Sequence, residues 1–332
     1  MFFFFFLFRI ILTSKIKYKE IYFSNNYYNF FFKTIEYSSI IYSTILCTIV
    51  KNENLYIKEF IEHYLSIGIN KIIVYDNNEE KGEKIEQILN EYIERGYIDI
   101  INFRGKKGAQ MLSFNDCYSN NKNLFDWIMY FDIDEFLILN EYKNINNFLT
   151  NKKYKECDVI QINWVIFDDN DLISYDNRPL NIRFTRPLYK QIVENRYVKS
   201  ICRTYVNLKW VDPHSPSGNF NICNINGNNT INKSIMKNNI ALESNLKKPY
   251  LKHFKYKTVE EYYGEKLNKG DVYYNDIKWE FFIDNSNYFF QINEWTKQKE
   301  DILNELLKIY LISKFGFSKY MKGKFLKINF IK

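Results

Sequence analysis

The chain of 332 residues has few of the residues that interrupt regular structure, with 11 glycines and 5 prolines. Collagen-like and low-complexity disordered proteins need a much larger share of both, so these classes are excluded. The 5 cysteines are far apart and form no Cys-x-x-Cys pair. We therefore expect neither a disulfide framework nor a zinc knuckle, and a reducing compartment fits this pattern best. On that basis we predict a cytoplasmic protein.

Apolar runs long enough to cross a membrane are also missing. Residues 1–12 are almost wholly apolar, but a membrane-spanning helix needs roughly 20 such residues. This run favours either an interfacial anchor or a terminus without fixed structure. The tail, residues 319–332, mixes lysines with apolar side chains. It favours either peripheral contact with the inner face of a membrane or a last helix packed on the domain.

A strong excess of one charge is likewise absent. Lys and Arg number 46 and Asp and Glu 39, which gives +7, and the charges are interspersed up to the tail. A DNA-binding protein would concentrate its basic residues in one stripe, so we expect no nucleic-acid partner. Aromatic residues make up 19% of the chain but are spread along its whole length, so they indicate no stacking surface.

What the sequence does contain, from residue 43 onward, is an alternation of predicted strands and helices. Short β-branched runs predict the strands, and apolar residues at helical spacing predict helices that end at Gly68 and Gly96. This alternation is typical of an α/β fold with a mostly parallel sheet flanked by helices, which binds ligands at the carboxyl ends of its strands. The expected strands are Thr44–Val50, Lys71–Tyr75, Tyr97–Phe103 and Trp127–Phe131; the expected helices are Leu55–Ile67, Glu83–Arg95 and Gln110–Asn120.

The turn after the first predicted strand contains no glycine, and no Gly-x4-Gly-Lys-Ser/Thr motif occurs in the chain. A dinucleotide site needs a glycine-rich turn there, so that the backbone can approach the pyrophosphate. NAD-dependent enzymes and P-loop NTPases are therefore disfavoured. Farther along, an Asn-rich stretch predicts a hairpin around Asn226-Gly227.

An acidic pair follows the fourth predicted strand. Asp132 and Asp134 come directly after the apolar run Trp-Ile-Met-Tyr-Phe. Side chains alternate along an extended segment, so both carboxylates should face the same way. Two carboxylates at a sheet edge can hold Mg²⁺ or Mn²⁺ and leave positions open for phosphate oxygens. A capped turn between strand and helix is the alternative interpretation.

A series of motifs occurs in a fixed order: TIVKNENLYIKEFIEHYLSIGINKIIVYDNN at 48–78, Gln110, WIMYFDIDEFL at 127–137, INWVIFDDN at 162–170, KSICR at 199–203 and HFKYKTVEEYYGEKLNKGD at 253–271. Their order and separations resemble those of the family-2-like and family-92 glycosyltransferases. These are nucleotide-sugar enzymes of GT-A fold. The resemblance covers about residues 43–271.

The resemblance implies a metal site. Asp132 and Asp134 match the Asp-x-Asp motif that holds the metal bridging the donor diphosphate, which would be Mn²⁺ or Mg²⁺. His253 is the best match for a histidine that completes the metal or diphosphate shell. His214, in a proline-bounded turn, is the second choice for that role.

The resemblance also implies where the donor nucleotide binds. Asn52 and Glu53 would line the nucleotide pocket, Asp76 would contact the base or ribose, and Gln110 would lie near the donor together with Asp132. The loop after the third predicted strand departs from the family pattern, because the glycine-rich loop found there in the family is reduced to RGKKGAQ in this chain. We interpret its basic residues as parts of a solvated loop.

An inverting transfer needs a carboxylate that deprotonates the acceptor hydroxyl. Asp168, Asp169 and Asp171 follow the predicted strand INWVIF, and Glu135 lies beside the acidic pair. These residues are candidates for the base, and the sequence does not rank them. The resemblance favours inversion.

We expect residues 1–42 to form an apolar, low-complexity N-terminal segment. Residues 43–271 would form the GT-A domain, with a nucleotide-sugar half (43–140) and an acceptor half (141–271) that adds an α+β extension. Residues 272–332 would form a helical segment with a basic amphipathic tail.

The predicted function is metal-dependent transfer of a sugar from a nucleoside-diphosphate sugar to a glycan or lipid-linked glycan acceptor. The resemblance favours a UDP-sugar. A nucleotidyltransferase also uses paired carboxylates with a divalent ion, but it normally has a glycine-rich loop near its first strand. A non-catalytic carbohydrate- or membrane-binding module is the other alternative, and the intact acidic pair argues against it.

Overall fold

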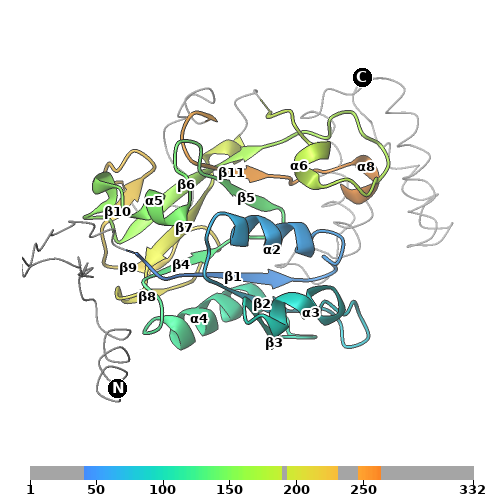
Figure 1. The fold of residues 1–332 in the computed structure, drawn as a ribbon, viewed down its shortest axis with the longest axis horizontal. Coiled ribbons are helices and arrows are strands. Elements are labelled where there is room, and N and C mark those ends of the chain that lie inside the picture. Colours follow the sequence, from blue (N-terminus) through green and yellow to red (C-terminus); the bar gives the residue numbers. More distant parts are fainter. Residues whose placement is uncertain (1–40, 189–192, 231–245, 263–332) are drawn as a thin grey trace, which may run out of the picture. The chain divides into compact units, whose positions relative to one another are not determined.

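The computed structural model describes residues 41–188, 193–230 and 246–262 (Figure 1). The predictions for the apolar N-terminal segment, the C-terminal helix and the basic tail lie outside these residues, as do those for 263–271. Within the described ranges, no helix is both long and apolar enough to cross a membrane.

A mixed sheet of nine strands organises the described residues, in the order β3-β2-β1-β4-β7-β6-β11-β5, with β10 also beside β6. The first four strands of this order pair in parallel, whereas β7 is antiparallel to both of its neighbours. Strands β10 and β11 pair in parallel with successive halves of β6. The strands are β1 (Thr44–Val50), β2 (Lys71–Asp76), β3 (Ile98–Asn102), β4 (Trp127–Tyr130), β5 (Glu135–Ile138), β6 (Val159–Ile166), β7 (Val198–Arg203), β10 (Ile222–Asn224) and β11 (Tyr250–His253). A separate ribbon joins β8 (Leu208–Lys209) to β9 (Ser217–Gly218).

Helices cover both faces of this sheet, and α2 and α4 lie on opposite sides of β1 (Figure 1). Alternate residues of β1 separate the two cores: Leu46 packs with α2 and α3 residues, whereas Ile45 and Cys47 pack with α4 residues. This division follows from the two-residue period of a strand. The helices are α2 (Ile57–Ser66), α3 (Glu86–Glu94), α4 (Ala109–Asn121), α5 (Ile145–Leu149), α6 (Leu180–Arg183) and α8 (Val259–Glu261), with 3₁₀ turns at Lys152–Tyr154 and Val193–Arg196.

The α/β architecture expected from the sequence is confirmed, and each predicted strand and helix up to residue 131 is present within a few residues of its expected bounds. Gly68 and Gly96 adopt positive φ angles of 96° and 75° directly after α2 and α3, as helix-ending glycines do. The sequence did not indicate that β7, from late in the chain, enters the sheet antiparallel between β4 and β6.

The turn predicted at Asn226-Gly227 is also present. Gly227 has a φ of 80° and its N–H donates to the Asn224 carbonyl at 2.9 Å. A Cβ atom at this position would lie 2.7 Å from the carbonyl oxygen of Lys153, so only glycine fits. The turn packs β10 against the segment that leads into β6.

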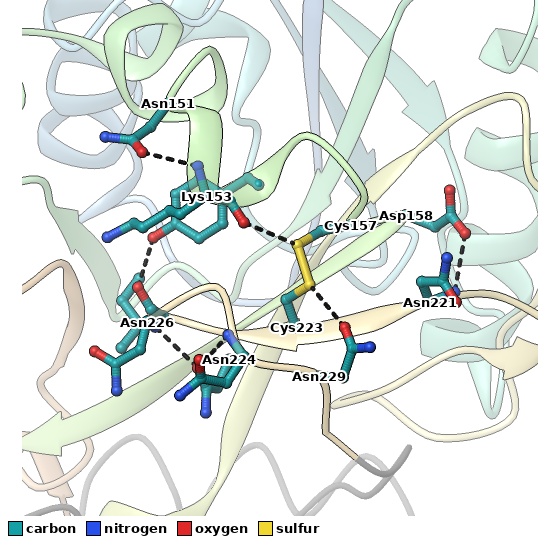
Figure 2. The surroundings of a disulfide bond; sticks show 12 residues. Asn151, Lys153, Cys157, Asp158, Asn221, Cys223, Asn224, Asn226 and Asn229 are labelled. Carbon is teal, nitrogen blue, oxygen red and sulfur yellow. Dashed lines mark hydrogen bonds between the residues drawn. A yellow bond between two sulfur atoms is a disulfide. The ribbon is translucent and has the colours of Figure 1, made fainter.

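The expectation of a chain without disulfides is wrong. Cys157 is bonded to Cys223 of β10 (Figure 2). Cys47 of β1 is bonded to Cys117 of α4, which leaves Cys202 as the buried free cysteine. The partners are 70 and 66 residues apart in sequence. Only strand pairing and helix packing bring them together, so local spacing could not show them.

The expectation of a reducing compartment rested on unpaired cysteines, and it loses that basis, because disulfides persist in oxidising surroundings.

Alkylation tests the pairing directly. The denatured, unreduced chain should gain one iodoacetamide adduct, at Cys202, whereas reduction should raise the number to all 5 cysteines. Mass spectrometry of chain purified from its native source under trapping conditions measures this, and a Cys202→Ser variant should gain none before reduction. Adducts at Cys157 or Cys223 without reductant would contradict the pairing.

Candidate active site

A tight turn joins β4 to β5 and contains the acidic pair. The Asp132 carbonyl accepts a hydrogen bond from the Glu135 N–H at 3.0 Å, and the Glu135 carboxylate accepts one from the Asp132 N–H at 3.0 Å. Ile133 and Glu135 are buried, whereas 34% of the Asp132 side chain and 19% of the Asp134 side chain are exposed. The turn therefore leaves both aspartate carboxylates partly accessible, and its hydrogen bonds to Glu135 fix the backbone of the turn.

Side chains from α4 and β7 hold the Asp132 carboxylate from two sides. Nε2 of Gln110 donates to Oδ1 at 3.1 Å, and Nζ of Lys199 donates to Oδ2 at 2.7 Å. Lys199 is fully buried, and its ammonium also lies 3.6 Å from the Glu135 carboxylate. Gln110 thus contacts the acidic pair, although its role toward a donor stays a prediction. Lys199 is a residue of the site that sequence reasoning missed, even though it begins the KSICR motif.

The two buried charged groups under this turn respond to burial in different ways. Burial raises the pKa of Glu135 well above its ordinary value, and Lys199 only partly opposes this. Burial lowers the pKa of Lys199, but attraction by Asp132 and Glu135 outweighs it and raises that pKa overall. Lys199 therefore stays charged, and one permanent positive charge lies directly beneath the acidic pair.

His253, at the end of β11, lies beside the second aspartate. In the sheet it pairs with Glu135 of β5 on one side and with Ile166 of β6 on the other. Its Nε2 atom is 3.5 Å from Oδ1 of Asp134, and the N–H of the next residue, Phe254, donates to the Asp134 carbonyl at 2.9 Å. The histidine expected at the acidic pair is thus in contact with it, because a late strand enters the sheet next to the turn.

His214 packs near the same place but is held differently. Its ring and that of His253 lie 5.0 Å and 4.4 Å from the Trp164 ring, and its Nδ1 lies 3.0 Å from the Val198 carbonyl. Burial, together with the nearby Lys199 charge, lowers the pKa of His214 to about 4. His214 is therefore neutral at neutral pH and has one ring nitrogen committed to the backbone.

The residues present fit a divalent ion that also binds phosphate. Asp134 supplies a hard carboxylate oxygen and His253 an imidazole nitrogen, which is a donor set that Mn²⁺ accepts. In the part of the chain that the structure describes, no group of three or more His, Cys, Asp or Glu side chains converges as a complete cage. An ion held by few protein ligands takes its remaining ligands from water and substrate phosphates.

The loops after β1 and β2 contain the residues expected at the nucleotide. Asn52 adopts a φ of 55° and its N–H donates to the Asn78 side chain at 2.7 Å, while the Glu53 carbonyl accepts the N–H groups that begin α2. Asp76 is buried, and its Oδ1 accepts hydrogen bonds from the backbone and side chain of Asn78. These contacts tie the two loops together, and the predicted contacts with nucleotide stay predictions.

Arg104 has a structural role that the interpretation as a solvated loop residue missed. Its side chain is 7% exposed and pairs with Asp76. It also donates to the carbonyls of Glu79 and Glu83 at 2.9 Å and 2.7 Å. Arg104 therefore holds the 79–83 loop over the end of β2 and occupies one oxygen of Asp76.

The carboxylates proposed as bases lie just beyond β6. Asp168 and Asp171 are 3.1 Å and 2.6 Å from the Arg186 guanidinium, and Oδ1 of Asp169, which is fully buried, accepts the Asp171 N–H. The Phe167 N–H, one residue earlier, donates to the His253 carbonyl at 3.1 Å. This group therefore adjoins the strand that carries His253, and Asp168 is the member less enclosed than Asp169.

The start of the HFKYKTVEEYY block has a structural explanation. Thr258 and Glu261 form a reciprocal capping box, in which each side chain accepts the other's backbone N–H at 3.1 Å. The Glu261 carboxylate also accepts two hydrogen bonds from Arg183, at 2.7 Å and 2.8 Å, and one from the Tyr56 hydroxyl at 2.7 Å. The block therefore fastens the end of β11, with His253, to α6 and the start of α2.

A comparison with protein families gives a match over most of the chain. The model of Glycosyltransferase family 92 matches residues 44–300. The chain belongs to this family. A family 92 protein of Ricinus communis is 24% identical over 117 residues, which are 35% of this chain and 21% of that protein. One of Oryza sativa subsp. japonica is 27% identical over 114 residues, which are 34% of this chain and 19% of that protein. The matches thus span about a fifth of the length of these family 92 relatives.

Solved glycosyltransferase structures are also similar to this family 92 chain. S. aureus TarS 1-349 in complex with UDP-GlcNAc is 12% identical with a TM-score of 0.37, over 82% of this chain and 73% of that chain. The mannosyltransferase PcManGT of Pyrobaculum calidifontis, in complex with GDP-Man and Mn²⁺, is 9% identical with a TM-score of 0.30, over 37% of this chain and 35% of that one.

Proposed function

We propose that this family 92 chain is a metal-dependent glycosyltransferase that moves a sugar from a UDP-sugar to a glycan or lipid-linked glycan acceptor, with inversion. The observation that carries the proposal is the contact between Asp134 and His253 beside an accessible Asp132. Family membership supports sugar transfer as the reaction. The choice of UDP rests on the resemblance of the motifs alone.

The residues of the chain divide the work in this proposal. Asp134 and His253 would hold Mn²⁺ or Mg²⁺, which when bound neutralises charge on a departing diphosphate as a Lewis acid. The protein's part is to keep these ligands fixed before the donor arrives. The turn hydrogen bonds and the β11 register keep the Asp134 and His253 side chains together.

A base near β6 would then serve the acceptor. Asp168 is our first choice over Asp169 and Glu135, because those two are fully buried. Arg186 pairs with Asp168 and would hold that carboxylate in place for the acceptor hydroxyl. The acceptor would enter from the side of Asp168, opposite the departing nucleotide.

A donor panel tests the proposal. With Mn²⁺ present, UDP should be released from at least one UDP-sugar at a rate that EDTA reduces to background, and GDP- and CMP-sugars should react more slowly. The measurement is nucleotide release by chromatography, and the anomeric configuration of the product, read by NMR, tests inversion. Full activity in EDTA would contradict the metal requirement.

The same panel separates the two alternative functions. A nucleotidyltransferase would form a nucleoside-diphosphate sugar from a nucleoside triphosphate and a sugar phosphate, with release of pyrophosphate. A binding module would release no nucleotide from any donor, yet would still bind glycan. Peripheral membrane contact by residues 1–12 or 319–332 stays a proposal that vesicle binding can test.

A further inference from the structure

The buried lysine under the acidic pair has no role in the mechanism above. Lys199 comes from β7, the strand inserted antiparallel between β4 and β6, and its side chain ends at Asp132 rather than in solvent. A buried ammonium is costly unless it is paired, and here its partners are Asp132 at 2.7 Å and Glu135 at 3.6 Å. Because its side chain is 1% exposed, it cannot swing away when a metal ion arrives.

This geometry gives the two aspartates different surroundings. Both Asp132 oxygens already accept a hydrogen bond, one from Lys199 and one from Gln110. Asp134 instead faces His253. The Asp132–Lys199 pair therefore contributes no net charge beside a cation held at Asp134.

We propose that Lys199 is a positioning residue that holds Asp132 and keeps the affinity for a free divalent ion low, so that metal and donor nucleotide bind cooperatively. The inference rests on the proposed function. A fixed positive charge a few ångströms from a metal site repels a second cation. The diphosphate of the donor brings negative charge that offsets this repulsion. By linkage, nucleotide then strengthens metal binding by the same factor by which metal strengthens nucleotide binding.

A charge-balance cycle of four proteins tests the inference, with Mn²⁺ alone as the probe and electron paramagnetic resonance as the readout. Lys199→Met removes the positive charge and should bind Mn²⁺ about tenfold more tightly than the native chain. Asp132→Asn leaves the lysine unpaired and should bind it about tenfold more weakly. The double variant removes both charges and should return to near the native affinity.

Each alternative explanation predicts a different order of Mn²⁺ affinities among the four proteins. If Asp132 is itself an essential metal ligand, the double variant should stay as weak as Asp132→Asn. If Lys199 only supports the fold, Lys199→Met should bind Mn²⁺ no better than the native chain. Either result overturns the inference. Lys199→Arg keeps the charge and should resemble the native chain, and circular dichroism identifies variants that do not fold. Should Lys199→Met fail to fold, the comparison of Asp132→Asn with the double variant still decides.

Adding UDP separates this inference from the proposed function. The native chain should gain Mn²⁺ affinity when UDP is present, and this gain should shrink at least about fivefold in Lys199→Met, because the repulsion that UDP offsets is gone. A native chain that binds no Mn²⁺, with or without UDP, would refute the metal site of the proposed function. If the native chain binds Mn²⁺ with UDP, and UDP raises the Mn²⁺ affinity of Lys199→Met by the same factor, only the role of Lys199 would be refuted.

Discussion

Replacing Asp134 with alanine is expected to lower sugar transfer by about 10³-fold, because this carboxylate would hold the ion that stabilises the departing diphosphate. The fold should remain intact, since the side chain is partly exposed and its backbone carbonyl keeps its bond to Phe254. Steady-state rates of UDP release, with circular dichroism on the same samples, measure both effects. Mn²⁺ binding should be lost together with activity.

Variants at other positions serve as comparisons for Asp134→Ala. Asp99 lies on β3, at the edge of the sheet, and pairs with Lys71 of β2 at the surface. Asp99→Ala removes this carboxylate, and activity should not change. His253→Ala should weaken Mn²⁺ binding in the same direction as Asp134→Ala. His214→Ala should weaken it less, because a ring nitrogen of His214 is bound to the Val198 carbonyl. Native turnover in Asp134→Ala would remove the basis of the proposed function.

The sequence predicted well those parts of the fold that depend on neighbouring residues. The strand at Thr44–Val50 has the expected bounds, because a short β-branched run closed by polar residues determines a buried strand locally. The turn at Asn226-Gly227 was predictable for the same reason, since its conformation depends on one glycine. The acidic pair was predictable because it follows an apolar run directly.

The features that sequence reasoning missed depend on contacts between distant segments. Lys199 reaches Asp132 only because β7 crosses from late in the chain to lie beside β4. The bond between Cys157 and Cys223 depends likewise on β10 joining β6. A lysine or cysteine alone carries no signal for such a partner, because register between strands is set by the whole sheet. Its place in the KSICR motif was the one available indication for Lys199.

The second large effect concerns stability, and it comes from the buried pair that fastens the end of β11. Arg183 and Glu261 are joined by two hydrogen bonds, and their side chains are 1% and 3% exposed. Arg183→Ala should destabilise the chain by about 3–5 kcal/mol, because it leaves the buried Glu261 carboxylate without its cationic partner. Urea unfolding followed by circular dichroism measures this as a lower midpoint.

The pair also predicts how stability depends on pH. Burial raises the pKa of Glu261, but hydrogen bonds from Arg183, Thr258 and Tyr56 outweigh it and bring that pKa below its ordinary value of 4.5. A carboxyl whose pKa is lowered in the folded state contributes stability above its unfolded pKa, and this is lost as the pH falls through the folded pKa. The difference between the native chain and Glu261→Gln should therefore be constant at neutral pH and shrink below about pH 4.5.

An exposed pair close by provides the control for Arg183→Ala. Arg178 and Asp176 are 2.7 Å apart, but their side chains are 55% and 33% exposed, so solvent screens the interaction. Arg178→Ala should therefore lower the urea midpoint much less than Arg183→Ala does. Loss of Arg183 should also reduce transfer, because the block that it anchors positions His253, whereas loss of Arg178 should not. Equal unfolding midpoints for the two variants would show that the buried pair does not hold β11 in place. In that case the pairing of β11 with β5 and β6 would alone position His253 beside the acidic pair.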